Sequence, residues 1–240
     1  MAQEFAKAGY NIVLNGFEST ATIAQLCRDL ETYGIGVLYS GADMRQPEQI
    51  TEMMTESAKH FGTIDVLINN AGIQHVAAIQ DFPCDKWQEI LDINLSAAFH
   101  TTRLAVPMMQ QAGWGRLINI ASVHGQIASP YKSAYVAAKH GLLGLTKTVA
   151  LELAEANITC NALCPGYVKT PLVEAQIPAT AREKNISETE VINEVMLKNQ
   201  ATKKFIARQD IAALALYLCS DHACSITGTS LNIDGGWCAQ

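Results

Sequence analysis

The chain has 240 residues, of which 49% are hydrophobic and 17% are charged, a balance that excludes an intrinsically disordered protein and predicts a large buried core. Its 17 basic and 23 acidic residues give a formal net charge of −6, so the chain lacks a broad positive field and we expect no nucleic-acid partner. No apolar stretch is as long as the about 18 residues that a membrane span requires. The opening MAQEFAKAGY lacks the features of a signal peptide. We therefore expect a cytoplasmic protein with no membrane partner.

Predicted strands recur along the chain as short runs of β-branched and aliphatic residues, each followed by a segment of helix length. Runs that are apolar throughout are typical of parallel strands covered on both faces by helices. The sequence therefore predicts an α/β fold, a doubly wound parallel sheet in one domain over residues 1–240. The predicted strands cover residues 11–14, 36–39, 64–68, 116–120, 158–162 and 230–233.

Two helices and one irregular segment complete this outline. Pro47 is expected to begin a helix, because proline suits the first helical position, and residues 133–156 are expected to form another. Residues 165–204 mix polar and apolar side chains, contain Pro171 and Pro178, and show no strand pattern. We expect helices here, on a mobile flap that covers a site.

The seven cysteines are scattered and never show the paired C-x-x-C spacing of structural zinc sites. A zinc site needs such pairs, or a pair with nearby histidines, to complete its four ligands. We therefore expect reduced thiols and no bound metal.

A serine, a tyrosine and a lysine are spaced for proton transfer to and from an alcohol. Ser122 follows a predicted parallel strand, at the end where such sheets bind ligands, and it can hydrogen-bond a substrate oxygen. Tyr135 and Lys139 are four residues apart, so they share a helix face, and we expect the lysine ammonium to favour the phenolate. Taken alone, the Tyr-x-x-x-Lys pair also suits a packed tyrosine beside a solvated lysine.

Two further motifs accompany this triad, Asn69-Asn70-Ala71-Gly72 after a strand and Asn94 in the next long helix. Together with Ser122, Tyr135 and Lys139 they resemble the short-chain dehydrogenase/reductase family over nearly the whole chain. The resemblance implies a Rossmann-type fold, hydride transfer with a nicotinamide cofactor, and a catalytic tetrad that Asn94 completes through a helix carbonyl and water. It also implies a homotetramer with helices around residues 85–111 and 133–156 at one interface.

The same resemblance implies a set of cofactor contacts. Asp43 matches the family's acid that bonds the adenine amino group. A turn after a later strand matches the family's turn that holds the nicotinamide amide. The cofactor-binding residues implied are Phe17, Asp43, Asn70, Ala71, Gly72, Tyr135, Lys139, Pro165, Gly166, Val168 and Thr170. Residues 15–18 (NGFE) contain no arginine or lysine for a ribose 2′-phosphate, which favours NAD over NADP. The family's ribose-binding aspartate is also absent there, which leaves Phe17 to pack against adenine.

Within the family, several short motifs of the chain are most similar to those of the branch that oxidises D-3-hydroxybutyrate to acetoacetate. They include GIQH at residues 72–75, SVHG at 122–125, and DGGW at 234–237. The substrate-binding residues that this resemblance implies are Gln74, His124, Lys132, Gln176 and Trp237. Amide, imidazole and ammonium donors around one carboxylate would fix the orientation of a small hydroxy acid. Singly, each of these side chains also suits an ordinary core or surface position.

The family begins with a strand and a T-G-x-x-x-G-I-G turn whose backbone N–H groups hold the cofactor pyrophosphate. The resemblance implies that both are lacking, because residues 1–9 match the later part of the helix that follows this turn. The absent strand would lie between those predicted at residues 11–14 and 64–68. Its loss removes about ten hydrogen bonds of about 1 kcal/mol each, against a domain stability of roughly 5–15 kcal/mol, so we expect an unstable chain.

Three interpretations therefore stay open. The first is an NAD-dependent 3-hydroxybutyrate dehydrogenase whose sequence record is incomplete. The second is a truncated, non-catalytic family member that keeps a binding or oligomer-forming role. The third is a 3-oxoacyl thioester reductase that uses NADPH.

Overall fold

Six strands form the centre of the protein in the computed structural model, which describes residues 1–239 apart from the side chains of Pro171, Leu172, Ala175 and Gln176. Each coincides with a predicted strand to within three residues at either end, so the predicted α/β class is confirmed. The strands are β1 (Ile12–Asn15), β2 (Val37–Ser40), β3 (Val66–Asn69), β4 (Gly115–Ile120), β5 (Ile158–Pro165) and β6 (Ser230–Ile233).

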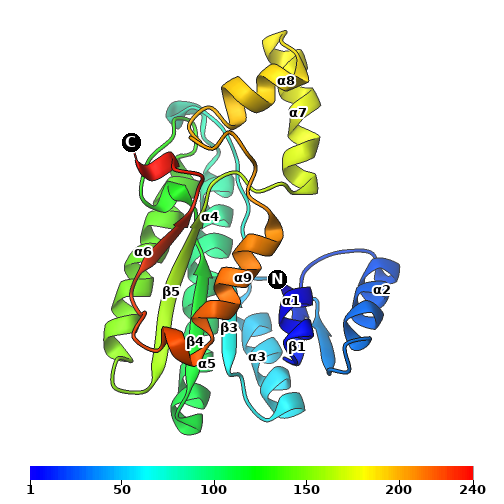
Figure 1. The fold of residues 1–240 in the computed structure, drawn as a ribbon, viewed down its shortest axis with the longest axis vertical. Helices are drawn as coiled ribbons and strands as arrows, with labels where there is room; N and C mark the ends of the chain where they lie inside the picture. The colour runs from blue at the N-terminus through cyan, green and yellow to red at the C-terminus, as the bar shows by residue number, and fades with distance from the viewer. Residues whose placement is uncertain (240) are drawn as a thin grey trace.

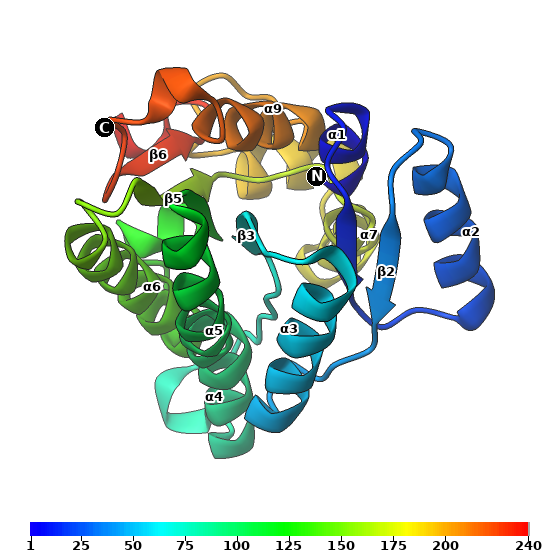
Figure 2. The same cartoon turned by 90° about the horizontal axis from the view of Figure 1, so that it is seen from below.

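The strands are arranged in two separate parallel sheets. One has the order β1-β2, and the other has the order β3-β4-β5-β6. In the larger sheet Leu117 of β4 lies opposite Cys160 of β5. The two sheets face each other across the edges of β1 and β3 (Figure 2), and no strand of the described residues pairs with either of these edges.

Helices cover both faces of these sheets. Figure 2 shows α3, α5 and α6 on one side and α1 and α9 on the other. The helices are α1 (Ala2–Lys7), α2 (Thr20–Glu31), α3 (Pro47–Phe61), α4 (Cys84–Leu91), α5 (Ala97–Ala112), α6 (Ser133–Glu152), α7 (Pro171–Lys184), α8 (Glu188–Glu190) and α9 (Arg208–Leu218). Pro47 begins α3 as predicted, and the helix predicted over residues 133–156 ends earlier, at Glu152. Within the described residues, no helix is both long and apolar enough to cross a membrane.

The long helix expected around residues 85–111 is interrupted by a π-helical turn at Asp92–Ser96, between α4 and α5. A π turn widens the helix by one residue per turn and is frequent at functional sites. Its central residue, Asn94, is buried. This turn therefore presents Asn94 toward the interior of the molecule.

Burial is uneven within the larger sheet. All eight residues of β5 are buried, because this strand is paired on both edges and covered on both faces. The four residues of β3 are only half-buried, although Val66, Leu67 and Ile68 are apolar and the strand lies inside the molecule. The core is therefore centred on β4 and β5, whose carboxyl ends lead into the segments around Ser122 and Gly166.

Residues 165–204 form the helices predicted for them, and α7 and α8 project beyond the sheet (Figure 1). Thr170 caps α7, since its hydroxyl accepts a hydrogen bond from the Val173 N–H at 3.2 Å. Ser187 and Glu190 form a reciprocal capping box at α8. A single parallel bridge joins Val168 to Ile206 and ties the base of this segment to the body of the protein.

The first residue of β4 gives a test of core packing. A Cβ atom on Gly115 would lie 2.5 Å from Met109 Sδ and 2.7 Å from Met109 Cβ, so we expect Gly115→Ala to lower the free energy of unfolding by about 1–3 kcal/mol. A Cβ atom on Gly144 of α6 would meet no heavy atom within 4 Å, so Gly144→Ala should raise stability by about 0.5–1 kcal/mol. Urea unfolding of both variants measures the difference, and equal stability of the two would contradict this packing.

Candidate active site

Ser122 stands at the start of a short turn after β4. Its Oγ accepts a hydrogen bond of 3.1 Å from the His124 N–H and caps the 3₁₀ turn Val123–Gly125. Gly125 lets this turn pack directly against α6, because a Cβ atom there would lie 2.9 Å from the Lys139 carbonyl oxygen. The turn thus holds the serine hydroxyl against the start of α6.

Tyr135 and Lys139 lie one helical turn apart on α6, and the structure brings both to Ser122. Burial raises the pKa of the Tyr135 phenol, and the Ser122 side chain beside it acts in the opposite direction. Lys139 Nζ lies 5.6 Å from the centroid of the Tyr135 ring and donates a hydrogen bond of 2.8 Å to the Ile120 carbonyl. The three residues predicted from spacing therefore form one group at the carboxyl end of β4.

Burial controls the charge state of this group. It lowers the pKa of Lys139 to about 8, because the buried ammonium has lost its water shell. Burial also raises the pKa of Tyr135, and the hydrogen bond with Ser122 only partly opposes this. Desolvation is therefore the largest effect on the phenol, and the role of Lys139 in favouring the phenolate stays a prediction.

Asn94 joins the π turn to the loop after β3. Its Oδ1 accepts a hydrogen bond of 2.8 Å from the Ile73 N–H, and its Nδ2 donates one of 2.9 Å to the Ile73 carbonyl. A Cβ atom at Gly72 would lie 3.5 Å from Asn94 Oδ1 and 3.7 Å from Lys139 Nζ. The asparagine side chain thus positions this loop beside Lys139, and its polar atoms bond backbone groups of Ile73 rather than a helix carbonyl.

An aromatic wall adjoins the triad and is built from three distant segments. The His124 ring lies 6.2 Å from the Tyr135 ring and 5.5 Å from the Trp237 ring, edge to face in both cases. Tyr167 stacks on Trp237 at 5.7 Å with an interplanar angle of 14°. Lys132 Nζ lies 6.0 Å from the Tyr167 centroid. The predicted substrate residues His124, Lys132 and Trp237 are therefore brought together around one side of Tyr135.

Two polar groups of this wall, His124 and Lys132, are poorly compensated for their burial. His124 is buried, and its Nδ1 has no hydrogen-bond partner among the residues that the structure describes. Burial, followed by the charge of Lys132, lowers the pKa of His124 to about 4, so the imidazole is neutral at pH 7. Burial also lowers the pKa of Lys132. An anion beside these two groups would satisfy the imidazole and restore the preference of the lysine for its charged form.

A buried glutamine that the sequence analysis missed holds the turn after β5. Gln200 Oε1 accepts a hydrogen bond from the Tyr167 N–H, and its Nε2 donates one of 2.7 Å to the Lys204 carbonyl. A Cβ atom on Gly166 would lie 2.5 Å from Gln200 Oε1, so glycine is required for this approach. No local motif marked Gln200, since its role depends on segments more than thirty residues apart.

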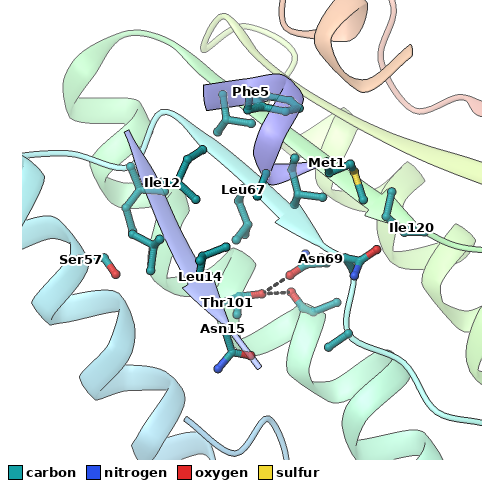
Figure 3. Close-up of a pocket in the computed structure, with 18 of the residues that line it drawn as sticks. Met1, Phe5, Ile12, Leu14, Asn15, Ser57, Leu67, Asn69, Thr101 and Ile120 are labelled. Atoms are coloured by element: carbon teal, nitrogen blue, oxygen red, sulfur yellow. Dashed lines mark hydrogen bonds between the residues drawn. The ribbon is translucent and has the colours of Figure 1, made fainter. Parts of the chain in front are cut away.

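A cavity of about 860 Å³ lies between β1 and β3 (Figure 3), and Asn94 and Ile120 form part of its lining. Asn69 forms part of its wall and is fixed by hydrogen bonds from Thr101 Oγ1 (2.6 Å) and to Asn119 Oδ1 (2.9 Å). Predicted cofactor residues that line the cavity are Asn70, Ala71, Pro165, Val168 and Thr170.

The other predicted residues lie farther out. Phe17 is 67% exposed in the loop after β1. Asp43 follows β2, and Arg45, which the sequence analysis missed, holds both its carboxylate oxygens at 3.0 and 2.6 Å and keeps the pKa of that carboxyl below its usual value. Gln74 is exposed in the loop after β3. It takes no part in the ring contacts that form the aromatic wall in the described structure. Gln176 is on α7, but its side chain lies outside the described residues.

Comparisons with known proteins agree over almost the whole chain. A family model described as Enoyl-(Acyl carrier protein) reductase matches residues 1–238. A D-beta-hydroxybutyrate dehydrogenase of Rhizobium meliloti (strain 1021) is 56% identical, and the match covers 100% of this chain and 93% of that protein. A D-beta-hydroxybutyrate dehydrogenase of Cupriavidus necator is 48% identical with the same coverage. The solved structure of a "Putative oxidoreductase from Escherichia coli str. K-12" is 32% identical, with a TM-score of 0.84, and the match covers 100% of this chain and 91% of that one.

The buried imidazole predicts a specific acid sensitivity. Because the pKa of His124 falls from 6.5 unfolded to about 4 folded, the unfolded chain binds more protons between these values, and stability falls as the pH drops through that window. We expect the free energy of unfolding to fall by about 3 kcal/mol between pH 7 and pH 4. His124→Asn should remove this fall. Urea unfolding at several pH values measures it, with His60→Asn, an exposed histidine on α3, as the control. Equal acid sensitivity of both variants would exclude His124 as the cause.

Proposed function

The chain belongs to the short-chain dehydrogenase/reductase family, and on that premise we propose that it interconverts D-3-hydroxybutyrate and acetoacetate with NAD as the cofactor. One observation carries this proposal. The proton-transferring group of Ser122, Tyr135 and Lys139 lies beside a wall that contains a desolvated ammonium and an imidazole whose Nδ1 has no partner among the described residues. A small molecule with a secondary alcohol and a carboxylate two carbons away would engage both.

The substrate carboxylate is the group that this wall suits. Lys132 supplies a positive charge at the rim, and His124 supplies a ring nitrogen that can donate a hydrogen bond. Charge-assisted bonds of this kind contribute about 1.5–3 kcal/mol each. The stacked rings of Tyr167 and Trp237 offer an apolar surface for the methyl group. The two relatives named D-beta-hydroxybutyrate dehydrogenase support this choice of substrate. Gln74 and Gln176 belong to the proposed carboxylate site through the resemblance alone.

Proton transfer in this proposal begins at Tyr135. The phenol first gives its proton to the neutral amine of Lys139, and the resulting phenolate oxygen accepts the hydroxyl proton of the substrate. The Ser122 hydroxyl bonds the same substrate oxygen and stabilises its developing charge. Lys139, whose pKa is lowered to about 8, exchanges a proton readily near neutral pH and passes it from the tyrosine toward solvent. Asn94 is a positioning residue, because it fixes the loop of Gly72 against Lys139.

The family implies a nicotinamide cofactor, which when bound supplies the hydride acceptor for C3 of the substrate. The residues present fit its nicotinamide end, since the wall of the cavity beside the triad is formed by Asn70, Ala71, Pro165, Val168 and Thr170, which carry no charge. Gly72 and Gly166 allow close backbone approach on either side. At the adenine end we assign Phe17 and Asp43, with Arg45 orienting the carboxylate of Asp43. The absence of a basic residue in residues 15–18 supports NAD over NADP.

The remaining assignments in this proposal concern the whole protein. We propose one catalytic domain over residues 1–240, with residues 165–204 as a flap that closes over bound substrate. A homotetramer in the cytoplasm is the state that the family resemblance supports. The alternatives of a non-catalytic protein and a 3-oxoacyl thioester reductase give different results in the assays below.

Replacing the proposed proton acceptor should stop turnover. With D-3-hydroxybutyrate and NAD, we expect Tyr135→Phe to lower kcat by about 10²–10⁴-fold, the usual contribution of general acid–base catalysis, while the Kd for the hydroxy acid changes little. Steady-state kinetics and calorimetry measure the two quantities. The matched control is Tyr217→Phe, which removes a hydroxyl from a 47% exposed tyrosine on α9 and should retain full activity.

Retained turnover in Tyr135→Phe would contradict the proposed role of this residue. Faster reduction of an acetoacetyl thioester with NADPH than oxidation of D-3-hydroxybutyrate with NAD would favour the thioester reductase. No turnover of either substrate by the unmodified, folded chain would favour the non-catalytic protein.

Removing the proposed carboxylate partner should weaken substrate binding selectively. We expect Lys132→Met to raise the KM for D-3-hydroxybutyrate about 10- to 100-fold, because one charge-assisted hydrogen bond is lost. The KM for the methyl ester of the same substrate should not change, since the ester has no carboxylate. Lys147→Met, an exposed lysine on α6, controls for the change in net charge. An equal effect of Lys132→Met on acid and ester would exclude a carboxylate contact.

A further inference from the structure

The segment that carries Trp237 turns sharply after β6 through two glycines. Gly235 and Gly236 have φ angles of +60° and +85°, in the left-handed region that glycine adopts without strain. Glycine also leaves the backbone more freedom than any other residue, so this turn does not by itself hold Trp237 in one place. The ring nevertheless stacks on Tyr167 at 5.7 Å and meets the edge of His124 at 5.5 Å. Other contacts must therefore fix the segment.

Asp234, the first residue after β6, supplies these contacts. It is only 7% exposed, and its Oδ1 accepts a hydrogen bond of 3.0 Å from the Gly236 N–H. Its Oδ2 accepts one of 2.8 Å from the Cys238 N–H. The Asp234 carbonyl accepts a third bond, of 3.3 Å, from the Trp237 N–H. Three consecutive backbone N–H groups centred on Trp237 are thus bonded to this one residue.

The backbone at Asp234 also supports the other ring of the stacked pair. A Cβ atom on Gly166 would lie 3.1 Å from Asp234 Cα, so the turn after β5 packs directly against it. The Gly166 N–H donates a hydrogen bond of 3.0 Å to the carbonyl of Ile233, the residue before Asp234. Tyr167 follows Gly166 in the chain. Both stacked rings are therefore held from one point at the end of β6.

The charge of Asp234 is compensated by backbone groups. Among the residues that the structure describes, no ion pair includes Asp234, and a buried carboxylate is costly unless it is hydrogen-bonded. Hydrogen bonds to a carboxylate are about twice as strong as those between neutral groups, and a carboxylate offers two oxygens where an amide offers one. The side chain thus holds the turn more firmly than an asparagine in an ordinary Asx turn would.

We infer that Asp234 is a positioning residue that fixes Trp237 in the aromatic wall and thereby limits the length of the alkyl end of the substrate. This inference rests on the proposed function, in which the stacked rings contact the substrate methyl group. Asp234 acts through Trp237 and not by contact with the substrate. A fixed wall discriminates against one additional methylene, a difference worth about 10- to 200-fold in a fitted pocket, whereas a wall that moves aside admits it.

Asp234→Asn tests the inference, because one of the two acceptor oxygens becomes an amide group. We expect the ratio of kcat/KM for D-3-hydroxybutyrate to kcat/KM for D-3-hydroxypentanoate to fall about three- to tenfold, mainly through KM. A residue that only stabilised the tail would lower both values equally and leave the ratio unchanged. The matched control is Asp221→Asn, an exposed aspartate that begins another 3₁₀ turn, which should leave both values unchanged.

Two further variants test whether Asp234 acts through Trp237. In a chain that carries Trp237→Ala, adding Asp234→Asn should not change the ratio further, because the positioned ring is already gone. Cys238→Pro removes the N–H that bonds Oδ2 but keeps the carboxylate, and it should lower the ratio about two- to threefold. An unchanged ratio in both Asp234→Asn and Cys238→Pro would overturn the inference. So would an equal effect of Asp234→Asn with and without Trp237.

A spectroscopic measurement separates this inference from the proposed reaction. The chain contains three tryptophans, so labelling with 5-fluorotryptophan gives three fluorine NMR signals, and Trp237→Phe identifies that of Trp237. We expect Asp234→Asn to shift or broaden this signal and to leave those of Trp87 and Trp114 in place. An unmoved Trp237 signal would overturn the inference. A moved signal in a chain that oxidises neither hydroxy acid would contradict the proposed function, while the positioning of Trp237 by Asp234 would stand.

Discussion

The hydrogen bond from Lys139 Nζ to the Ile120 carbonyl, at 2.8 Å, joins α6 to the end of β4, and the rest of the site depends on this junction. A buried ammonium is costly unless it is hydrogen-bonded, so the bond fixes how far α6 lies along the strand. Tyr135 is one turn earlier on the same helix, and this places its phenol at the Ser122 hydroxyl. Burial around the junction lowers the pKa of Lys139 to about 8 and raises that of Tyr135, so desolvation favours the neutral form of both groups.

The loops on either side of this junction are held by side chains that lie far apart in sequence. Asn94 accepts from and donates to Ile73, and so connects a π turn to the loop after β3. Gln200 is fully buried and connects the turn at Tyr167 to the Lys204 carbonyl. Each amide satisfies backbone groups that no strand or helix reaches. Gln200 thus holds the Tyr167 side of the aromatic wall, and Asn94 holds the loop beside Lys139.

The divided sheet contrasts with this well-connected half of the protein. β4 and β5 are paired on both edges, whereas β1 and β3 each keep one open edge in the described part of the chain. A core cluster still spans the division, since Phe5 and Ile12 belong to the same apolar group as Ile118 and Leu163. The two sheets are thus joined by side chains and helices without a shared backbone ladder. The residues proposed for the nicotinamide lie on the continuous side, and those proposed for adenine lie on the two-stranded side.

The sequence by itself determined the α/β class, the six strands and the grouping of Ser122, Tyr135 and Lys139. These follow from apolar runs, from the helical spacing of four residues, and from the rule that parallel strands end at one edge, all of which are local or periodic. Only the tertiary structure decided that burial dominates the pKa of Tyr135, that Arg45 holds Asp43, that Asn94 bonds Ile73, and that Gln200 supports the aromatic wall. Desolvation and long-range hydrogen bonds depend on which distant segments meet in space. Neither residue spacing nor composition specifies these meetings.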